Sequence, residues 1–179
     1  KMKILCFDTE TTDLIKAHNN SKFHILQLSW IVHDTETLTE EENNFVLDVP
    51  LKKITNSWIH RITKEISQKG YYFSEIIDIF LHDVDQCDIL IGYNLIFDLN
   101  ALEIELSKLN MWDQIDMIYS KRFSDPMKNY SSLYNCKYIK LTDMYLQFFG
   151  EQLKGAHDAI VDVRATLRVH LELKIISSV

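Results

Sequence analysis

The chain has 179 residues and a formal net charge of −7, a length that suits one compact domain with a sizeable core. With only 2 prolines and 4 glycines it is neither collagen-like nor linker-rich, and no apolar run approaches the roughly 20 residues that span a bilayer, so we expect no membrane partner. The acidic balance excludes a passive nucleic-acid-binding module, because Lys and Arg on phosphates supply most of the affinity of such proteins. An acidic chain can still engage phosphates through divalent cations held by a carboxylate cluster.

Three strands are expected in the first third of the chain. Met2–Asp8 is a short, almost continuous apolar run, typical of a strand buried on both faces. After a polar loop at Thr11–Lys22, Phe23–His33 reads as a second strand. A turn-like segment at Asp34–Glu42 then precedes a third strand at Asn44–Val49.

Helices dominate the rest of the chain. Ser74–Asp85 places Ile76, Ile77, Phe80, Leu81 and Val84 on one face, with Ser74 as the expected N-cap. The later elements expected are a buried strand at Asp88–Tyr93, a helix at Leu99–Leu109 with Leu102, Leu106 and Leu109 inward, a helix at Leu141–Phe149 ending at Gly150, and a helix at Asp158–Leu173. This order predicts an α/β domain with a mixed sheet, a single domain over residues 1–179. Lys1, which precedes Met2, is expected to be a cloning remnant.

The cysteines indicate a reducing compartment. Cys6, Cys87 and Cys136 are odd in number, widely spaced and form no C-x-x-C pair. A structural zinc site or a disulfide framework is therefore not expected, and we expect a cytoplasmic protein.

Two acidic residues close the first strand. Asp8 and Glu10 are two apart, so their side chains point to the same face of the strand. Neighbouring carboxylates repel unless they are protonated or bridged by a cation, and a pair of magnesium ions would remove that cost. Taken alone, an Asp-x-Glu pattern is more often a solvated strand end.

Two further groups of polar residues follow later in the chain. Asp98 falls in the first turn of a helix, just after Asn94, where an acid also suits the helix dipole. His157 precedes the last helix, and Asp162 lies one turn above Asp158. An imidazole at the lip of a site could accept a proton from water. Each residue singly could be a cap, a turn residue or a surface acid. The occurrence of all three groups in this order is harder to explain without a shared site.

These residues carry a resemblance to a known family. Phe7-Asp8-Thr9-Glu10-Thr11-Thr12, then Asn94-x-x-Phe97-Asp98, then His157-x-x-x-x-Asp162, resemble the three motifs of the DEDDh, or DnaQ-like, 3′→5′ exonucleases. The likeness runs from about Met2 to Leu173, and Trp58 to Thr63 and Asp125-Pro126-Met127 also resemble family segments, the latter one in proofreading subunits. The histidine lies five residues before Asp162, whereas the sister subclass has a tyrosine four before, where this chain has Asp158.

The resemblance implies an RNase H-like fold, a mixed five-stranded sheet flanked by helices, with two Mg²⁺ or Mn²⁺ ions as cofactors. It implies catalytic roles for all five motif residues. Asp8, Glu10, Asp98 and Asp162 would be the metal ligands, and His157 the general base that activates water. Thr11, Thr12, His60 and Asn94 would contact the substrate. The implied reaction is hydrolysis of the terminal phosphodiester of single-stranded nucleic acid, releasing nucleoside monophosphates.

Three positions depart from the family pattern. Asp13 stands where a glycine commonly follows the two threonines, Arg61 where a glycine commonly follows the histidine, and Tyr93 where a histidine often precedes the asparagine. None of these removes an expected metal ligand or the base. We expect them to tune substrate choice.

Several alternatives stay open. DNA-binding and proofreading are favoured, but an RNA-directed 3′→5′ exoribonuclease fits the same residues, because discrimination depends on how the site meets a 2′-hydroxyl. A non-catalytic module that docks on a replication complex is the alternative from another class; loss of a carboxylate would have supported it, and none is lost. A polymerase or replication complex is also a plausible partner of an active enzyme.

Overall fold

The computed structural model describes residues 2–16 and 20–177. Lys1, the expected cloning remnant, and residues 17–19 of the expected polar loop lie outside this part of the chain. The described residues form a five-stranded sheet, with the strands in the order β3-β2-β1-β4-β5. The strands are β1 (Lys3–Thr11), β2 (Ile25–Asp34), β3 (Glu40–Val46), β4 (Ile89–Ile91) and β5 (Arg122–Ser124). β1, β2 and β3 pair antiparallel, whereas β4 and β5 run parallel to β1, so the predicted mixed five-stranded sheet is confirmed.

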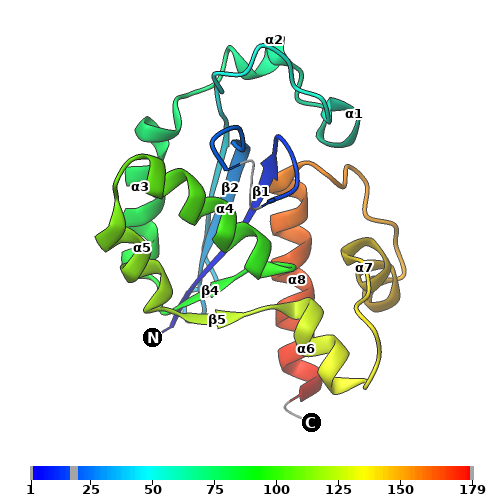
Figure 1. Ribbon diagram of the computed structural model, residues 1–179. Helices are drawn as coiled ribbons and strands as arrows, with labels where there is room; N and C mark the ends of the chain where they lie inside the picture. Colours follow the sequence, from blue (N-terminus) through cyan, green and yellow to red (C-terminus); the bar gives the residue numbers. More distant parts are fainter. Residues whose placement is uncertain (1, 17–19, 178–179) are drawn as a thin grey trace.

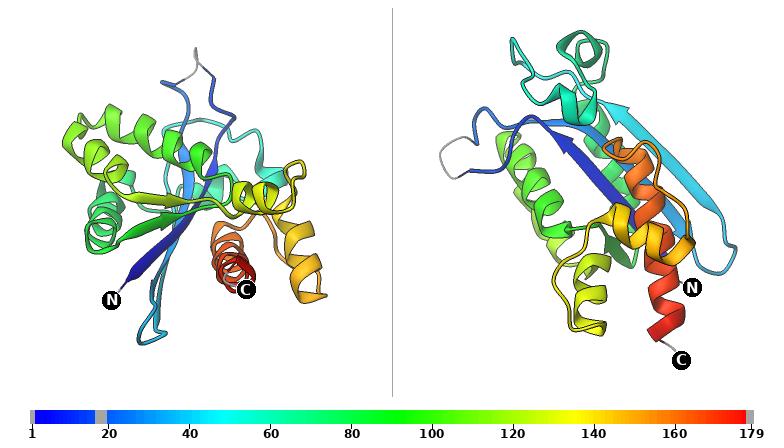
Figure 2. Two further views of the ribbon diagram at one scale, coloured as in Figure 1. Left: turned by 90° about the horizontal axis from the view of Figure 1, so that it is seen from below. Right: turned by 90° about the vertical axis from the view of Figure 1, so that its right-hand side faces the viewer.

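Helices cover both faces of the sheet. They are α1 (Ser57–His60), α2 (Lys64–Ser67), α3 (Phe73–Gln86), α4 (Leu95–Lys108), α5 (Trp112–Tyr119), α6 (Pro126–Leu133), α7 (Leu141–Phe149) and α8 (Ala159–Ser177). Figure 1 shows α3, α4 and α5 on one side of the sheet and α8 on the other, with α6 and α7 beside α8. In Figure 2 the same two helical layers enclose the strands. Among the described residues, no helix is both long and apolar enough to cross a bilayer.

The alternation of side chains along β1 supplies both helical layers with apolar surface. Leu5 and Phe7 are fully buried in the larger core with α3 and α4. Ile4 and Cys6 point to the opposite face and pack with Ile160 and other residues of α8. Residues with period two along a strand share a face, so Asp8 and Glu10 continue the row that begins at Ile4 and Cys6. The face covered by α8 therefore changes from apolar to acidic at the end of β1 where α8 begins.

Most of the expected elements form, with different bounds. β1 runs on to Thr11 because its pairing with β2 continues to Thr11↔Ile25 through a register shift. β3 begins at Glu40, inside the segment expected to be a turn. Its first residues are acidic and exposed, as on an edge strand, so they do not show the apolar pattern that predicts a strand. The apolar face expected for α3 is buried, but the helix begins at Phe73, where the Glu75 carboxylate accepts a hydrogen bond from Tyr72 N–H, and Ser74 is not the cap.

Two further expectations concern helix ends. Gly150 ends α7 in a left-handed conformation (φ 70°), as expected. Leu109 was expected to face inward, but it follows the end of α4 and is 40% exposed. The expectation for Leu109 was wrong because the helical period no longer governs side-chain direction beyond the C-terminal residue.

Candidate active site

Asp8 and Glu10 lie where β1 emerges from the core, opposite Ser29 and Gln27 of β2. The pKa of the Asp8 carboxyl is raised well above its usual value, first by burial and then by Asp98, Asp162 and Glu10. Burial, followed by Asp162, Asp98 and Asp158, raises the pKa of Glu10 to about 8. Carboxylates far apart in the sequence thus act on one another across a small volume.

Asp98 reaches this volume from the first turn of α4. β4 pairs with β1 only as far as Cys6, so the edge of β1 is open beyond that point. The Asp98 side chain, 3% exposed, occupies this edge: its Oδ1 accepts hydrogen bonds from Thr9 N at 3.0 Å and from Thr9 Oγ1 at 2.6 Å. Burial raises the pKa of Asp98 to about 7, although the hydrogen bonds from Thr9 oppose this shift.

The start of α4, which positions Asp98, is fixed by Asp125. The Asp125 carboxylate accepts hydrogen bonds from the backbone N–H groups of Asn94 and Leu95, at 3.1 Å each. The same carboxylate accepts from Met127 N and caps α6. Asn94 itself has φ 59°, a left-handed conformation that asparagine tolerates. In the sequence Asp125 stands out only as part of a family-like segment, so this role was not predicted.

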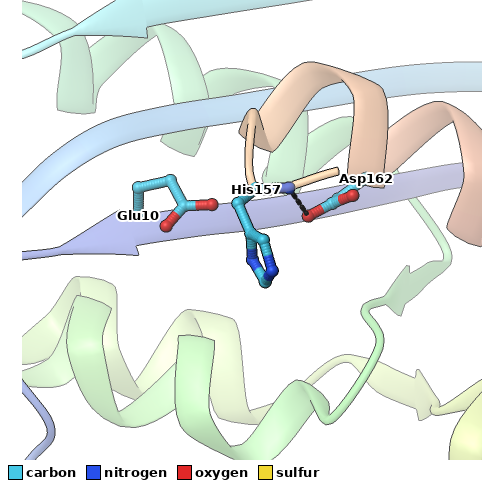
Figure 3. A group of neighbouring side chains, drawn as sticks. All are labelled: Glu10, His157 and Asp162. Carbon is cyan, nitrogen blue, oxygen red and sulfur yellow. Dashed lines mark hydrogen bonds between the residues drawn. The ribbon is translucent and has the colours of Figure 1, made fainter. Parts of the chain in front are cut away.

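Asp162 and His157 come from the start of α8 and the residues before it. Asp162 Oδ2 accepts a hydrogen bond from His157 N at 3.0 Å, and this bond holds His157 at φ 69°. Asp162 Oδ1 is buried and has no hydrogen-bond partner among the described residues. Burial raises the pKa of Asp162 to about 6, whereas the hydrogen bond and charge of His157 oppose the shift. Figure 3 shows Glu10 and Asp162 on either side of the exposed His157.

This arrangement fits divalent cations. Glu10, His157 and Asp162 each offer a ligand atom within 4.8 Å of the others. Asp8 and Asp98 are not part of that group, but Asp98, Asp162 and Glu10 all raise the pKa of Asp8, so these carboxylates lie close to one another. The carboxylates supply hard oxygen donors, which Mg²⁺ and Mn²⁺ prefer, and the unpartnered Asp162 Oδ1 is a buried acceptor still lacking a positive partner.

The four residues expected to contact substrate lie around this cluster. Thr11 Oγ1 donates to the Asp13 carbonyl oxygen. Thr12 is buried, and its hydroxyl accepts a hydrogen bond from His24 N, so this side chain braces the loop. His60 is buried and Asn94 exposed. Substrate contact by these four residues stays a prediction.

Two cavities meet at His157. One, of about 290 Å³, is lined by residues that include Gln27, Asn44, His60, Arg61 and Asp158. The other, of about 470 Å³, is lined by residues that include Tyr93, Asn94, Tyr138, Lys140 and Asp162. His157 lines both cavities, so it stands between them in one depression beside the carboxylates.

Comparison with protein families identifies the chain. A family model described as an exonuclease, RNase T, matches residues 5–170. The chain belongs to this exonuclease family. The predicted membership of an exonuclease family and the predicted enzyme class, an exonuclease, are therefore confirmed. No curated protein sequence matches the chain significantly.

Solved structures show the same fold. A 3′-exonuclease in a structure described as 3′-end specific recognition of histone mRNA stem-loop has a TM-score of 0.71 at 14% identity, over 96% of this chain and 63% of that one. The nuclease domain of 3′hExo, a DEDDh family member bound to rAMP, has a TM-score of 0.71 at 15% identity, over 98% of this chain and 92% of that one. Exonuclease X with 5′ overhanging duplex DNA has a TM-score of 0.66 at 14% identity, over 98% and 93%. The present chain thus spans about 63% of the length of the first of these proteins. At 14–15% identity, the three structures show only that this chain has the RNase H-like fold.

The structure explains how this exonuclease accommodates its departures from the family pattern. Arg61 ends α1 with φ 62°, the left-handed region that favours the glycine common at this position. The Tyr93 hydroxyl donates to the Ile139 carbonyl oxygen at 2.5 Å, which ties the wall of the larger cavity to the start of α4. Asp13 Oδ1 accepts from Leu14 N and so shapes the loop after the threonines.

The raised carboxyl pKa values predict an unusual pH dependence of stability. Without metal, the folded enzyme keeps Glu10 protonated up to about pH 8 and Asp98 up to about pH 7. In the unfolded chain both groups lose their protons near pH 4. The folded state therefore binds more protons between these limits, and the free energy of unfolding falls as pH rises, by roughly 1.4 kcal/mol per pH unit for each such group.

Urea denaturation in EDTA from pH 5 to pH 8 measures this decline. Magnesium is expected to flatten the curve, because bound cations favour the ionised carboxylates. The Glu10→Gln variant, which lacks the group with a pKa of about 8, is expected to show a shallower decline in EDTA. Stability in EDTA that stayed constant or rose over this range would contradict the prediction.

Proposed function

We propose that the chain hydrolyses the terminal phosphodiester at the 3′ end of single-stranded nucleic acid and releases nucleoside monophosphates, and that residues 1–179 act as one exonuclease domain. The proposal is supported by one observation above all. Carboxylates from β1, α4 and α8 meet in a partly buried cluster, where Asp98 and Asp162 raise the pKa values of Asp8 and Glu10, and the exposed His157 stands beside it. Such a cluster costs stability unless cations occupy it, so its presence favours catalysis over a structural role.

The five motif residues are assigned the following roles. Asp8, Glu10, Asp98 and Asp162 would hold two Mg²⁺ or Mn²⁺ ions, with Asp8 and Asp162 on the side of the attacking water. When bound, the ions would lower the pKa of that water and offset the charge on the leaving 3′-oxygen. His157 takes the proton from the water. Its ring is exposed to the two cavities, whereas its backbone is fixed by Asp162, which suits a base that must meet a substrate.

The strand end is proposed to bind in the depression around His157. The backbone at Thr11 and Thr12 would guide the terminal nucleotide, with Asn94 and His60 as further contacts from the walls of the two cavities. Arg61 and Lys140, both exposed, line one cavity each and supply positive charge beside the carboxylates. These lysine and arginine side chains are suited to phosphates.

DNA is the proposed substrate, with proofreading as the role, on the likeness of the Asp125-Pro126-Met127 segment to proofreading subunits. RNA is the second candidate, because the structural relatives include a 3′-exonuclease described with a histone mRNA stem-loop as well as Exonuclease X with duplex DNA. A polymerase or replication complex as partner stays a prediction. So does a cytoplasmic location, for which the three free cysteines are the supporting observation.

Digestion of oligonucleotides labelled at either end tests the proposal. Matched DNA and RNA single strands are incubated with the enzyme in Mg²⁺, Mn²⁺ or EDTA, and products are separated by length. We expect a 3′ label to be released at once as mononucleotide, a 5′ label to move through a ladder of shortening strands, and EDTA to stop both. Internal cleavage, or release of a 5′ label as mononucleotide, would contradict the proposal.

Metal titration separates this proposal from the non-catalytic docking module. An active exonuclease is expected to gain thermal stability on addition of millimolar Mg²⁺, because the cations relieve repulsion among the carboxylates. Failure of the chain to bind Mg²⁺ or Mn²⁺ and to degrade any strand would favour the docking module.

A further inference from the structure

One polar side chain of β2 is buried beside the site without belonging to any of the three motifs. Gln27 is 5% exposed and pairs with Glu10 across the antiparallel strands β1 and β2, so both side chains lie on the face covered by α8. A buried amide must satisfy its hydrogen bonds or destabilise the fold. The partners of Gln27 are therefore informative.

Gln27 uses both ends of its amide. Its Nε2 donates to Asn44 Oδ1 and to Asp158 Oδ1, at 2.9 Å each. Its Oε1 accepts from Ala159 N at 3.3 Å, which caps the first residue of α8 from another element. Asn44 Oδ1 also accepts from Ser29 Oγ, so Asn44 presents an acceptor that orients the Gln27 amide. Gln27 thus connects the sheet to the two residues that immediately follow His157.

His157 is consequently held on both sides. Its own N–H donates to Asp162 Oδ2, and the next two residues are bound to Gln27. The left-handed backbone of His157 (φ 69°) is unfavourable for a residue with a Cβ atom, and such a conformation persists only where the surroundings impose it. Asp162 imposes it from within α8, and Gln27 from the sheet.

We propose that Gln27 is a positioning residue of the exonuclease reaction. Through Asp158 and Ala159 it fixes the backbone at His157, so that the imidazole stays beside Glu10 and Asp162. The proposal rests on the proposed function of His157 as the base. Gln27 lines one cavity, but its hydrogen bonds go to Asn44, Asp158 and Ala159 and to none of the four carboxylates. Its loss is therefore expected to change the placement of the base more than the binding of metal or strand.

The Gln27→Leu variant is the first test, with a side chain of similar size and no hydrogen bonds. We expect kcat to fall roughly 10–100-fold, the usual cost when a supporting partner of a site residue is lost, while KM and the Mg²⁺ concentration for half-maximal activity change less than about 3-fold. Ser29→Ala is the matched control: Ser29 lies on the same strand and bonds to the same Asn44 oxygen, but makes no contact with the segment after His157. It is expected to retain the kcat of the unmodified enzyme.

A double variant separates positioning from general destabilisation. If Gln27 acts through His157, adding Gln27→Leu to His157→Ala lowers kcat no further. A further loss of the same size as in the single variant would overturn the proposal, since Gln27 would then act independently of the base.

A donor–acceptor exchange decides the matter even if Gln27→Leu fails to fold. Gln27→Glu places a carboxylate against Asp158 and is expected to lower kcat. Combining it with Asp158→Asn lets the asparagine amide donate to the new carboxylate, which still accepts from Ala159 N, and is expected to restore most of kcat. No recovery in the folded pair would refute the proposal.

Activity of the unmodified enzyme distinguishes failure of the proposed function from failure of the role proposed for Gln27. No nuclease activity in it would end the proposed function, whereas an active enzyme with full kcat in Gln27→Leu would end the role of Gln27 alone.

Discussion

The Asp8→Asn variant is expected to lose at least about 10³-fold in nuclease activity, and yet to unfold at a higher temperature than the unmodified enzyme in EDTA. Loss of activity follows from the place of Asp8 in the cluster, where its pKa is raised by Asp98, Asp162 and Glu10. If cations bind among these groups, removing one anionic ligand forfeits several kcal/mol of transition-state stabilisation.

The gain in stability follows from the same repulsion. Without metal, the folded chain must keep Asp8 protonated at a pH where the unfolded chain ionises it, and this costs free energy. Asparagine is neutral in both states and has no such cost. We expect a higher Tm for Asp8→Asn in EDTA at neutral pH, and a difference that shrinks as pH falls toward 4.

Thermal unfolding in EDTA and in Mg²⁺, together with nuclease assays, measures both effects. The control is Asp78→Asn, the same change at an exposed position of α3, which is expected to alter neither activity nor Tm appreciably. A fully active Asp8→Asn enzyme would refute the proposed metal ligands. An inactive variant that was also less stable in EDTA would instead show that Asp8 makes a net favourable contribution without metal.

The positions of Asp8 and Glu10 could be predicted because they depend only on local geometry. Strand alternation puts both on one face, and the structure pairs them with Ser29 and Gln27 on the face that α8 covers. The same holds for α3, whose apolar residues at helical spacing are all buried. Where the periodicity of one strand or helix determines the face on which a side chain lies, the sequence is sufficient to predict that face.

Other features depend on contacts that no local pattern reveals. β5 has three residues, two of them exposed, and exists because it pairs with β4. The helices α5 and α6, of eight residues each, were not predicted either. In the sequence Gln27 is one polar residue within an apolar run. Its role depends on a hydrogen bond to Asp158, which lies 131 residues away in the chain. Asp125 likewise holds Asn94 from 31 residues away.

The site contains residues that local sequence patterns predict and residues whose roles depend on long-range contacts. Motif residues supply the charges, and their spacing predicts which charges meet. Gln27, Asn44 and Asp125 are neutral or satisfied partners that fix backbone at the starts of α4 and α8. A buried polar residue in an otherwise apolar strand is the one signal that could have drawn attention to Gln27 before the structure was known.

The His157→Ala variant is expected to lower kcat by about 10²–10⁴-fold, the usual contribution of a general base, without abolishing the response to Mg²⁺. His157 offers a ring nitrogen within 4.8 Å of oxygen atoms of Glu10 and Asp162, so a role as metal ligand is the competing assignment. Magnesium prefers oxygen donors, and four carboxylates remain in the variant, which favours the base. The two roles therefore predict different responses of Tm to metal.

Thermal shift titrations with Mg²⁺ and Mn²⁺ distinguish the two roles of His157. If it is the base, His157→Ala keeps the metal-induced rise in Tm and loses only turnover, whereas Asp8→Asn loses much of both. If it is a ligand, the rise in Tm weakens in His157→Ala, more so with Mn²⁺, which accepts imidazole nitrogen more readily than Mg²⁺. His82→Ala, at an exposed histidine of α3, serves as the control and should change neither quantity. If His157→Ala keeps the metal-induced rise in Tm but loses kcat, the carboxylates alone account for metal binding. His157 would then act in proton transfer.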